Sequence, residues 1–135
     1  MRALVVDDDV VSRGFASAIL KRIGFEVEVA ATGHDALQRA IIGEPAALVL
    51  VDWHLGAPDA GLAVIRQLRA LPGTHHTCVC LWSVDRNREI WNIAIHAGAN
   101  AVLPKPLGPE HMWMLLSRLG VLQAAQNAAA APALR

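Results

Sequence analysis

The sequence predicts a doubly wound α/β domain, in which a five-stranded parallel sheet is covered by five helices. Short apolar runs typical of buried strands alternate with longer segments whose apolar side chains recur at helical spacing. Several of the helical segments end at a glycine, a common helix terminator, as at Gly24, Gly43 and Gly98. Because parallel strands need crossover connections, this alternation favours one sheet between two helical layers.

The first half of the chain contains three of the expected strands and two of the expected helices. Residues 3–6 form a short apolar run, and residues 10–23 carry apolar side chains at helical spacing. Residues 26–30 alternate Glu with Val and predict a weaker strand, and residues 33–42 predict a helix. Residues 46–51 are continuously apolar, as expected of a central parallel strand covered on both faces.

The second half repeats the pattern. A helix is expected over residues 62–71, where Pro72-Gly73 stops it, and a strand over residues 77–82. A further helix covers residues 87–97 and a strand residues 101–103. The last helix, residues 109–119, begins with a proline, which the first helical turn accepts.

The composition limits the organisation and the classes of partner. A chain of 135 residues with 54% hydrophobic residues is one ordered domain, expected over residues 1–122, before an Ala-rich tail over 123–135 that extends the last helix or is disordered. No apolar run approaches the ~20 residues of a membrane span, and no signal peptide is recognisable. The balance of 12 basic and 12 acidic side chains, without a helix-turn-helix, argues against nucleic acid. We therefore expect no membrane or nucleic-acid partner.

The two cysteines, Cys78 and Cys80, lie two positions apart in one expected strand. We expect their side chains to point to opposite faces of the sheet and not to form a disulfide. Reduced thiols fit a cytoplasmic protein.

Polar side chains follow the strands at their carboxyl ends, where such folds place their sites. Asp7, Asp8 and Asp9 follow the first strand, and Asp52 follows the third. Ser83 follows the fourth strand and Lys105, between two prolines, follows the fifth.

This group of side chains fits phosphoryl transfer. Carboxylates brought close together repel, and a hard divalent cation such as Mg²⁺ relieves the repulsion through oxygen ligands. A carboxylate can then attack phosphorus, while a cation, a hydroxyl and an ammonium bind the three oxygens of the transferred group. A simpler interpretation of the first aspartates is an acidic turn that caps the following helix. The polar residues that follow the third, fourth and fifth strands argue against this interpretation.

Together these segments resemble the receiver domain of two-component response regulators, in a stand-alone form with the flavodoxin-like receiver topology. The resemblance runs from Arg2 to about Leu122 and rests on segments that occur in order at the family's separations: 4–9, 48–52, Gly61, 81–83, 97–99 and 103–106. It implies a Mg²⁺-dependent phosphoacceptor that takes its phosphoryl group from a sensor histidine kinase or a phosphotransfer protein. Its only catalysis would be its own phosphorylation and dephosphorylation.

The resemblance also implies a role for each matching residue. Asp52 corresponds to the phosphoacceptor, Ser83 to the hydroxyl that follows the phosphoryl group and Lys105 to the ammonium that pairs with it. The metal would be held by Asp52, by Asp8 directly and by Asp7 mostly through water.

The backbone carbonyl of His54 would complete the metal ligands.

Three positions depart from the family pattern. Gly56 stands where a proline is usual. Val84 replaces a small residue, and we expect it to crowd the site and slow phosphoryl entry or loss. Val102 replaces an aromatic residue of the usual switch.

The family's output face consists of the elements at 87–97, 101–103 and 109–119. We expect Trp91, Val102 and Trp113 on this face, with Trp113 facing outward, as a surface for a downstream target or a homodimer.

Two other functions stay open from the residues alone. A phosphorylation-independent interaction module would share the fold. A haloacid-dehalogenase-like phosphatase would use Asp7 as nucleophile and Asp9 as acid/base, but it would leave Asp52 without a role.

Overall fold

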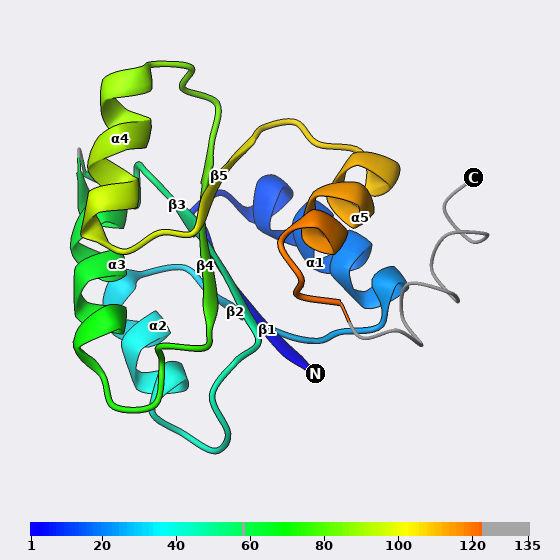
Figure 1. Ribbon diagram of the computed structural model, residues 1–135, viewed down its shortest axis with the longest axis horizontal. Coiled ribbons are helices and arrows are strands. Elements are labelled where there is room, and N and C mark those ends of the chain that lie inside the picture. Colours follow the sequence, from blue (N-terminus) through cyan, green and yellow to red (C-terminus); the bar gives the residue numbers. More distant parts are fainter. Residues whose placement is uncertain (58, 123–135) are drawn as a thin grey trace.

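The structure, a computed structural model, describes residues 1–57 and 59–122 and confirms the predicted fold class (Figure 1). The five parallel strands form one sheet in the order β2-β1-β3-β4-β5. The strands are β1 Arg2–Val6, β2 Glu26–Ala30, β3 Leu48–Asp52, β4 Cys78–Ser83 and β5 Ala101–Pro104. The helices are α1 Val10–Ile23, α2 Gly33–Ala40, α3 Ala60–Ala70, α4 Arg88–Ala97 and α5 Pro109–Arg118.

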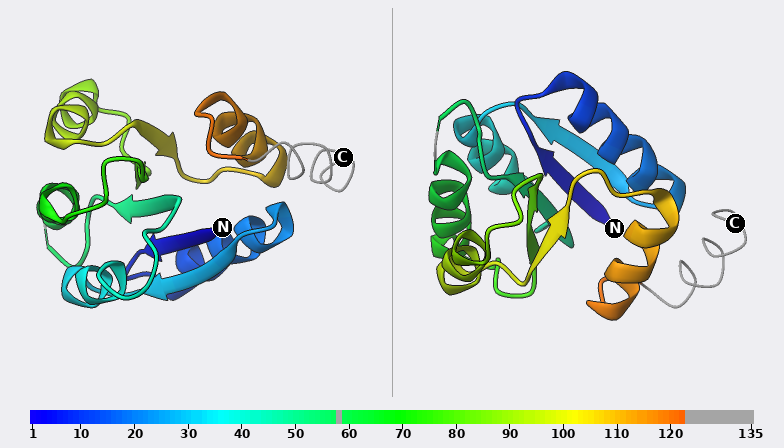
Figure 2. Two further views of the ribbon diagram at one scale, coloured as in Figure 1. Left: turned by 60° about the horizontal axis from the view of Figure 1, so that its bottom comes forward. Right: turned by 90° about the horizontal axis from the view of Figure 1, so that it is seen from above.

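The sheet lies between two layers of helices. Helices α1 and α5 cover one face, and α2, α3 and α4 cover the other (Figures 1 and 2). The chain moves outward from β1 to β2, returns to β3 on the other side of β1, and continues to β4 and β5. The reversal of strand order at β1 and β3 makes their carboxyl ends the switch point of the fold.

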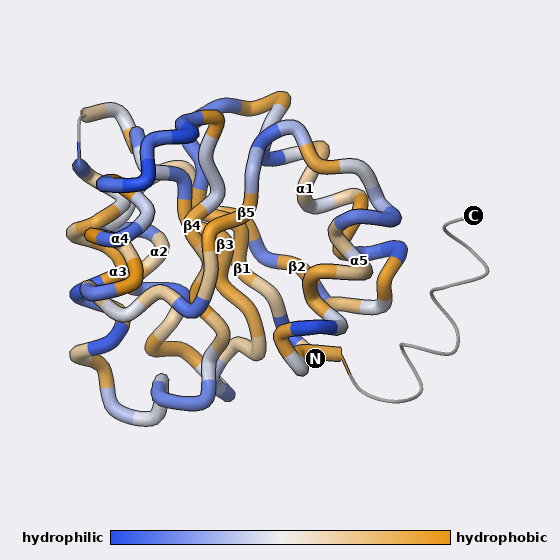
Figure 3. The backbone as a smooth tube through the Cα atoms, turned by 45° about the horizontal axis from the view of Figure 1, so that its top comes forward, coloured by the Kyte–Doolittle hydropathy of each residue, from blue (hydrophilic) through white to orange (hydrophobic). Residues whose placement is uncertain are grey.

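The buried core has one apolar layer on each face of the sheet. In β1, Ala3 and Val5 join the layer under α1 and α5, whereas Leu4 and Val6 join the layer under α2, α3 and α4. This division follows from the alternation of side chains along a strand. The central strands β1, β3 and β4 accordingly form a hydrophobic centre in the hydropathy view (Figure 3). Burial of both faces explains why β3 is apolar up to its last residue, Asp52.

The five helices begin and end within two residues of their expected bounds. Capping residues account for both ends of α1. Asp9 caps α1 by accepting a hydrogen bond from the Ser12 amide, and Gly24 ends it in the left-handed region at φ 115°. Helix α2 is shorter than predicted and ends at Ala40, because the next two residues, Ile41 and Ile42, have no core to pack on and are exposed. Gly43, a common helix terminator, had suggested two more helical residues.

The expectation that the two cysteine side chains point to opposite faces of the sheet is wrong. Cys78 and Cys80 are free, but their sulfur atoms are 3.7 Å apart on the same face of β4. Residues two positions apart on a strand share a face, because side chains alternate with a period of two. Cys80 is therefore buried beside the half-buried Cys78 in the layer under α1 and α5.

Within the described residues, no helix has the length and apolar content that crossing a membrane requires. The predicted tail at 123–135 lies outside the described residues.

Candidate functional site

The strand order brings the polar residues predicted at the strand ends to one edge of the sheet. Strands β1 and β3 are neighbours, and their register pairs Val6 with Val51. The next residue on each strand, Asp7 and Asp52, therefore projects from the same end of the sheet. Asp8 follows directly in the turn toward α1.

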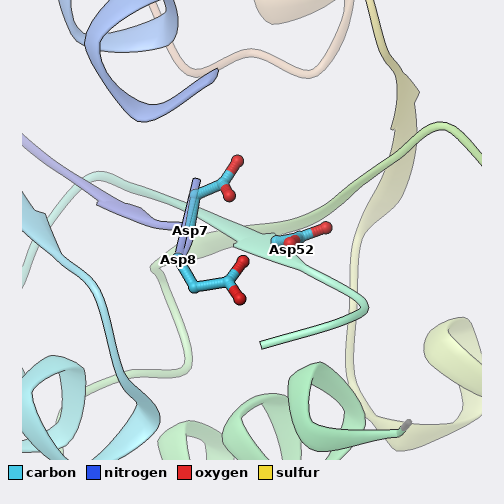
Figure 4. A group of neighbouring side chains, drawn as sticks. All are labelled: Asp7, Asp8 and Asp52. Atoms are coloured by element: carbon cyan, nitrogen blue, oxygen red, sulfur yellow. The ribbon is translucent and has the colours of Figure 1, made fainter. Parts of the chain in front are cut away.

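Three carboxylates meet at this edge (Figure 4). One oxygen each of Asp7, Asp8 and Asp52 lies within 4.8 Å of the others, a spacing at which a single cation could bind all three. Asp7 is fully buried and Asp52 is 8% exposed, whereas Asp8 is exposed to solvent. The cluster thus has a buried side against the sheet and an open side.

Lys105 provides a positive charge beside the carboxylates. Its Nζ donates to Oδ2 of Asp7 at 2.6 Å and lies 3.4 Å from Oδ1 of Asp52. Its backbone amide donates to the carbonyl of Ser83 at 2.9 Å, which fixes the turn after β5 against the end of β4. The side chain is 12% exposed, so the ion pair with the buried Asp7 is largely shielded from water.

The pKa of Asp52 is raised above its ordinary value of 3.8. Burial is the largest cause, because it penalises the charged carboxylate. The neighbouring Asp7 raises the pKa further, while Lys105 and a backbone hydrogen bond from His54 lower it. The ionised form of Asp52 is therefore less stable than that of a free carboxylate, and a bound cation would stabilise it.

Ser83 ends β4 one position after Trp82, which pairs with Asp52 in the sheet register. It is buried, and its Oγ accepts a hydrogen bond from the amide of Asp85 at 3.0 Å. The hydroxyl hydrogen remains available to a ligand at this end of the sheet.

The loop after Asp52 explains one departure from the family pattern. Gly56 has a φ of 77°, which a proline, held near about −65°, cannot adopt. Its amide donates to the carbonyl of His54 at 2.8 Å, leaving one lone pair on that oxygen for a metal. Downstream, Gly61 donates to the carbonyl of Trp53 at 2.9 Å and packs directly against the backbone of Asp52.

One side chain of the predicted partner face, Trp113, is placed differently in the structure. Trp91, Val102 and Trp113 are all half-buried, and the prediction that Trp113 faces outward is wrong. Trp113 packs on the core layer under α1 and α5, and its indole nitrogen is buried without a hydrogen-bond partner among the described residues. Helical periodicity showed where Trp113 lies around α5, but not which neighbours cover it. The exposed apolar residues of α4 are Ile93 and Ile95.

A second group of residues at this end of the sheet was not predicted. A groove of about 400 Å³, here named the α1–β4 groove, opens beside Lys105. It is lined by Asp9, Val11, Ser12, Phe15, Trp82, Val84, Lys105 and Pro106. Val11 and Val84 are 79% and 65% exposed, so the walls of the groove present apolar side chains to solvent. The sequence signal that could have indicated this groove is the apolar pair at the start of α1, directly after the aspartates.

The strand ends of this doubly wound parallel sheet gather three carboxylates and a lysine, an arrangement suited to a hard cation and a phosphoryl group. The chain belongs to the response regulator receiver domain family, whose model matches residues 3–117.

Known relatives agree with this assignment. The chain is 29% identical over 112 residues to a probable chemotaxis protein CheY of Rhizobium etli, covering 83% of this chain and 86% of the relative. It is 39% identical over 123 residues to response regulator MprA of Mycobacterium avium, covering 90% of this chain but only 50% of that protein.

Solved structures show the same fold. Chemotaxis protein CheY4 of Vibrio cholerae superposes with a TM-score of 0.80 at 27% identity, covering 90% of this chain and 98% of that one. A response regulator of Burkholderia pseudomallei, solved with a phosphorylated aspartic acid and a calcium ion, has a TM-score of 0.73 at 28% identity and covers 98% and 72%.

Proposed function

We propose that residues 1–122 form a cytoplasmic receiver domain that accepts a phosphoryl group on Asp52 in a Mg²⁺-dependent reaction. The observation that carries the proposal is the position of the Asp52 carboxylate, grouped with Asp7 and Asp8 and 3.4 Å from Lys105. Asp52 is the suitable nucleophile, because it is partly accessible while Asp7 is fully buried and bonded to Lys105.

The donor set suits Mg²⁺. Three carboxylates within reach of one another and a free lone pair on the His54 carbonyl supply the oxygen ligands that this ion prefers. Asp8 would bind it directly from the open side, Asp52 would share it, and Asp7 would act mostly through water. When bound, the ion would neutralise charge on the carboxylates and on the transferred phosphoryl group.

The remaining residues would bind the phosphoryl oxygens. Lys105 lies between Asp7 and Asp52, so a short movement of its ammonium would pair it with an oxygen on phosphorylated Asp52. The Ser83 hydroxyl, at the end of the neighbouring strand, would donate to a second oxygen.

The phosphatase alternative is not supported by this geometry. Asp7 would have to be the nucleophile, but its carboxylate already accepts from Lys105 and from the Asp9 amide. The interaction-module alternative has support only in Val84 and Val102, since the acceptor cluster itself is complete.

We propose a sensor histidine kinase or phosphotransfer protein as the phosphodonor, docking over the α1–β4 groove. The exposed apolar side chains of this groove lie beside Lys105, where a protein that delivers a phosphoryl group to Asp52 must approach. A downstream target or a second copy would then bind at α4, β5 and α5, where Ile93 and Ile95 are exposed.

Incubation with acetyl phosphate and Mg²⁺, followed by intact-mass measurement, tests the function. The parent protein should gain one phosphoryl group, Asp52→Asn should gain none, and Asp59→Asn, at an exposed aspartate in the same loop, should behave like the parent. Chelation of Mg²⁺ should abolish labelling. Labelling of Asp52→Asn, or none of the parent, would contradict the proposal.

A further inference from the structure

Trp82 is the largest fully buried side chain of the domain and has no role in the function proposed above. It stands on β4 between Asp52 and Leu103 in the sheet register, one residue before Ser83. Its side chain points into the layer under α1 and α5 and forms part of the wall of the α1–β4 groove. An aromatic ring therefore lies beneath the phosphoacceptor site.

Two contacts define the position of this ring. The indole Nε1 donates to Oγ of Ser12 on α1 at 3.3 Å, and the Nζ of Lys105 lies 5.7 Å from the ring centroid. The second distance is within the roughly 6 Å over which a cation is attracted to the face of an indole. The ring is thus held by α1 on one side and faces the ammonium of Lys105 on the other.

Lys105 needs such support, because it borders both the carboxylate cluster and the open groove. Asp9, an exposed carboxylate, also lines the groove. Without the indole, the Lys105 side chain would face a wider groove, and its ammonium would be free to leave Asp7 and Asp52. A catalytic group that samples several positions loses rate, because only one of them meets the reacting atoms.

We propose that Trp82 is a positioning residue that holds the ammonium of Lys105 over the phosphoacceptor. This inference rests on the proposed function, since it assigns Lys105 to the phosphoryl group. It adds a chain-specific element, an indole at the end of β4, that couples α1 and the groove to the chemistry at Asp52.

The test compares Trp82→Phe with Trp82→Leu. Phenylalanine keeps an aromatic face for the cation but loses the N–H, whereas leucine removes the π system. Cation–π attraction corresponds to roughly a twofold to thirtyfold effect on an equilibrium or rate. We expect Trp82→Leu to slow phosphorylation by acetyl phosphate within that range and Trp82→Phe to retain most of the rate. Thermal unfolding of both variants shows whether their folds are comparably stable.

Mg²⁺ affinity, measured by calorimetry, separates positioning from structural damage. If Lys105 is released in Trp82→Leu, the carboxylates lose a neutralising charge, so Mg²⁺ should bind at least as tightly while phosphorylation slows. Damage to the site would weaken both. Ser12→Ala, which frees the indole without changing core volume, should give a smaller loss of rate and provides the test if the Trp82 variants do not fold.

Three results would overturn the inference: parent rates in Trp82→Leu and Ser12→Ala, equal losses in the Phe and Leu variants, or parallel losses of rate and Mg²⁺ affinity. Failure of the proposed function is a different result, because the parent protein itself would then take up no phosphoryl group or would be labelled elsewhere than at Asp52.

Discussion

Replacing Gly61 by alanine should destabilise the domain, although the residue lies in a helix where alanine is normally favoured. A Cβ at this position would overlap the carbonyl oxygen of Asp52 and lie 2.8 Å from the Cα of Trp53. Both are backbone atoms, so no side-chain rotation can relieve the overlap. The start of α3 would have to move away from the phosphoacceptor segment.

The expected magnitude follows from two opposing effects. Alanine gains up to about 1 kcal/mol in helix propensity over glycine. Forcing extra atoms into a packed site costs typically about 1–3 kcal/mol, and more where backbone must shift. We expect a net loss of about 2 kcal/mol in the free energy of unfolding. With a urea m-value of about 1–3 kcal/mol/M, the midpoint of denaturation falls by about 1 M.

Gly14→Ala is the matched control, because Gly14 lies within α1 and a Cβ there would meet nothing within 4 Å. It should be more stable than the parent by up to about 1 kcal/mol. Urea denaturation followed by far-UV circular dichroism measures both variants. If Gly61→Ala were as stable as Gly14→Ala, the close packing between α3 and Asp52 would be refuted.

Three further predictions concern Asp52, Val84 and Arg69. The pKa of Asp52 is raised by burial, so its contribution to stability is fully present below the ordinary pKa of 3.8 and is lost as pH rises through the raised value. Asp52→Asn should therefore gain in melting temperature over the parent from acid to neutral pH in metal-free buffer; a constant difference would contradict the shift. Val84→Ala should speed loss of the phosphoryl group, measured by the decay of phosphorylated protein after removal of acetyl phosphate; an unchanged decay would show that Val84 does not crowd the site. Arg69→Ala should cost about 2 kcal/mol in urea denaturation, because Arg69 donates to the carbonyls of Gly98 and Thr74 and to the side chain of Asn100. Arg66→Ala, at an exposed position on the same helix, should change stability little; equal effects would contradict this role of Arg69.

The sequence predicted the fold because its local signals agree with the buried sheet. The apolar run before Asp52 is a central strand, and Asp9 and Gly24 cap α1 as their residue types favour. Each predicted polar residue also reached the same edge of the sheet, since parallel strands end together there. The order of strands and turns along the chain was enough to predict this common edge.

What could not be predicted depends on contacts between distant segments. The terminator Gly43 suggested a helix through Ile42, but Ile41 and Ile42 lie exposed beyond the end of α2. The burial of Trp113 depends on how α5 lies against α1 and the sheet. The contact of Trp82 with Ser12 joins residues 70 positions apart, and no local pattern encodes such a pair. The wrong expectation that Cys78 and Cys80 point to opposite faces did not depend on distant contacts. The period of two along a strand already places residues two positions apart on one face.

The grouping of three carboxylates around a single ammonium has a consequence for the order of events. With Asp52 ionised, these four groups carry a net charge of about −2. A phosphoryl donor is itself anionic, so it meets electrostatic opposition until a divalent ion has cancelled that excess. The domain would then respond only when two inputs coincide, an occupied cation site and a charged donor. On the function proposed above, the concentration of free divalent cation would contribute to the threshold of the response.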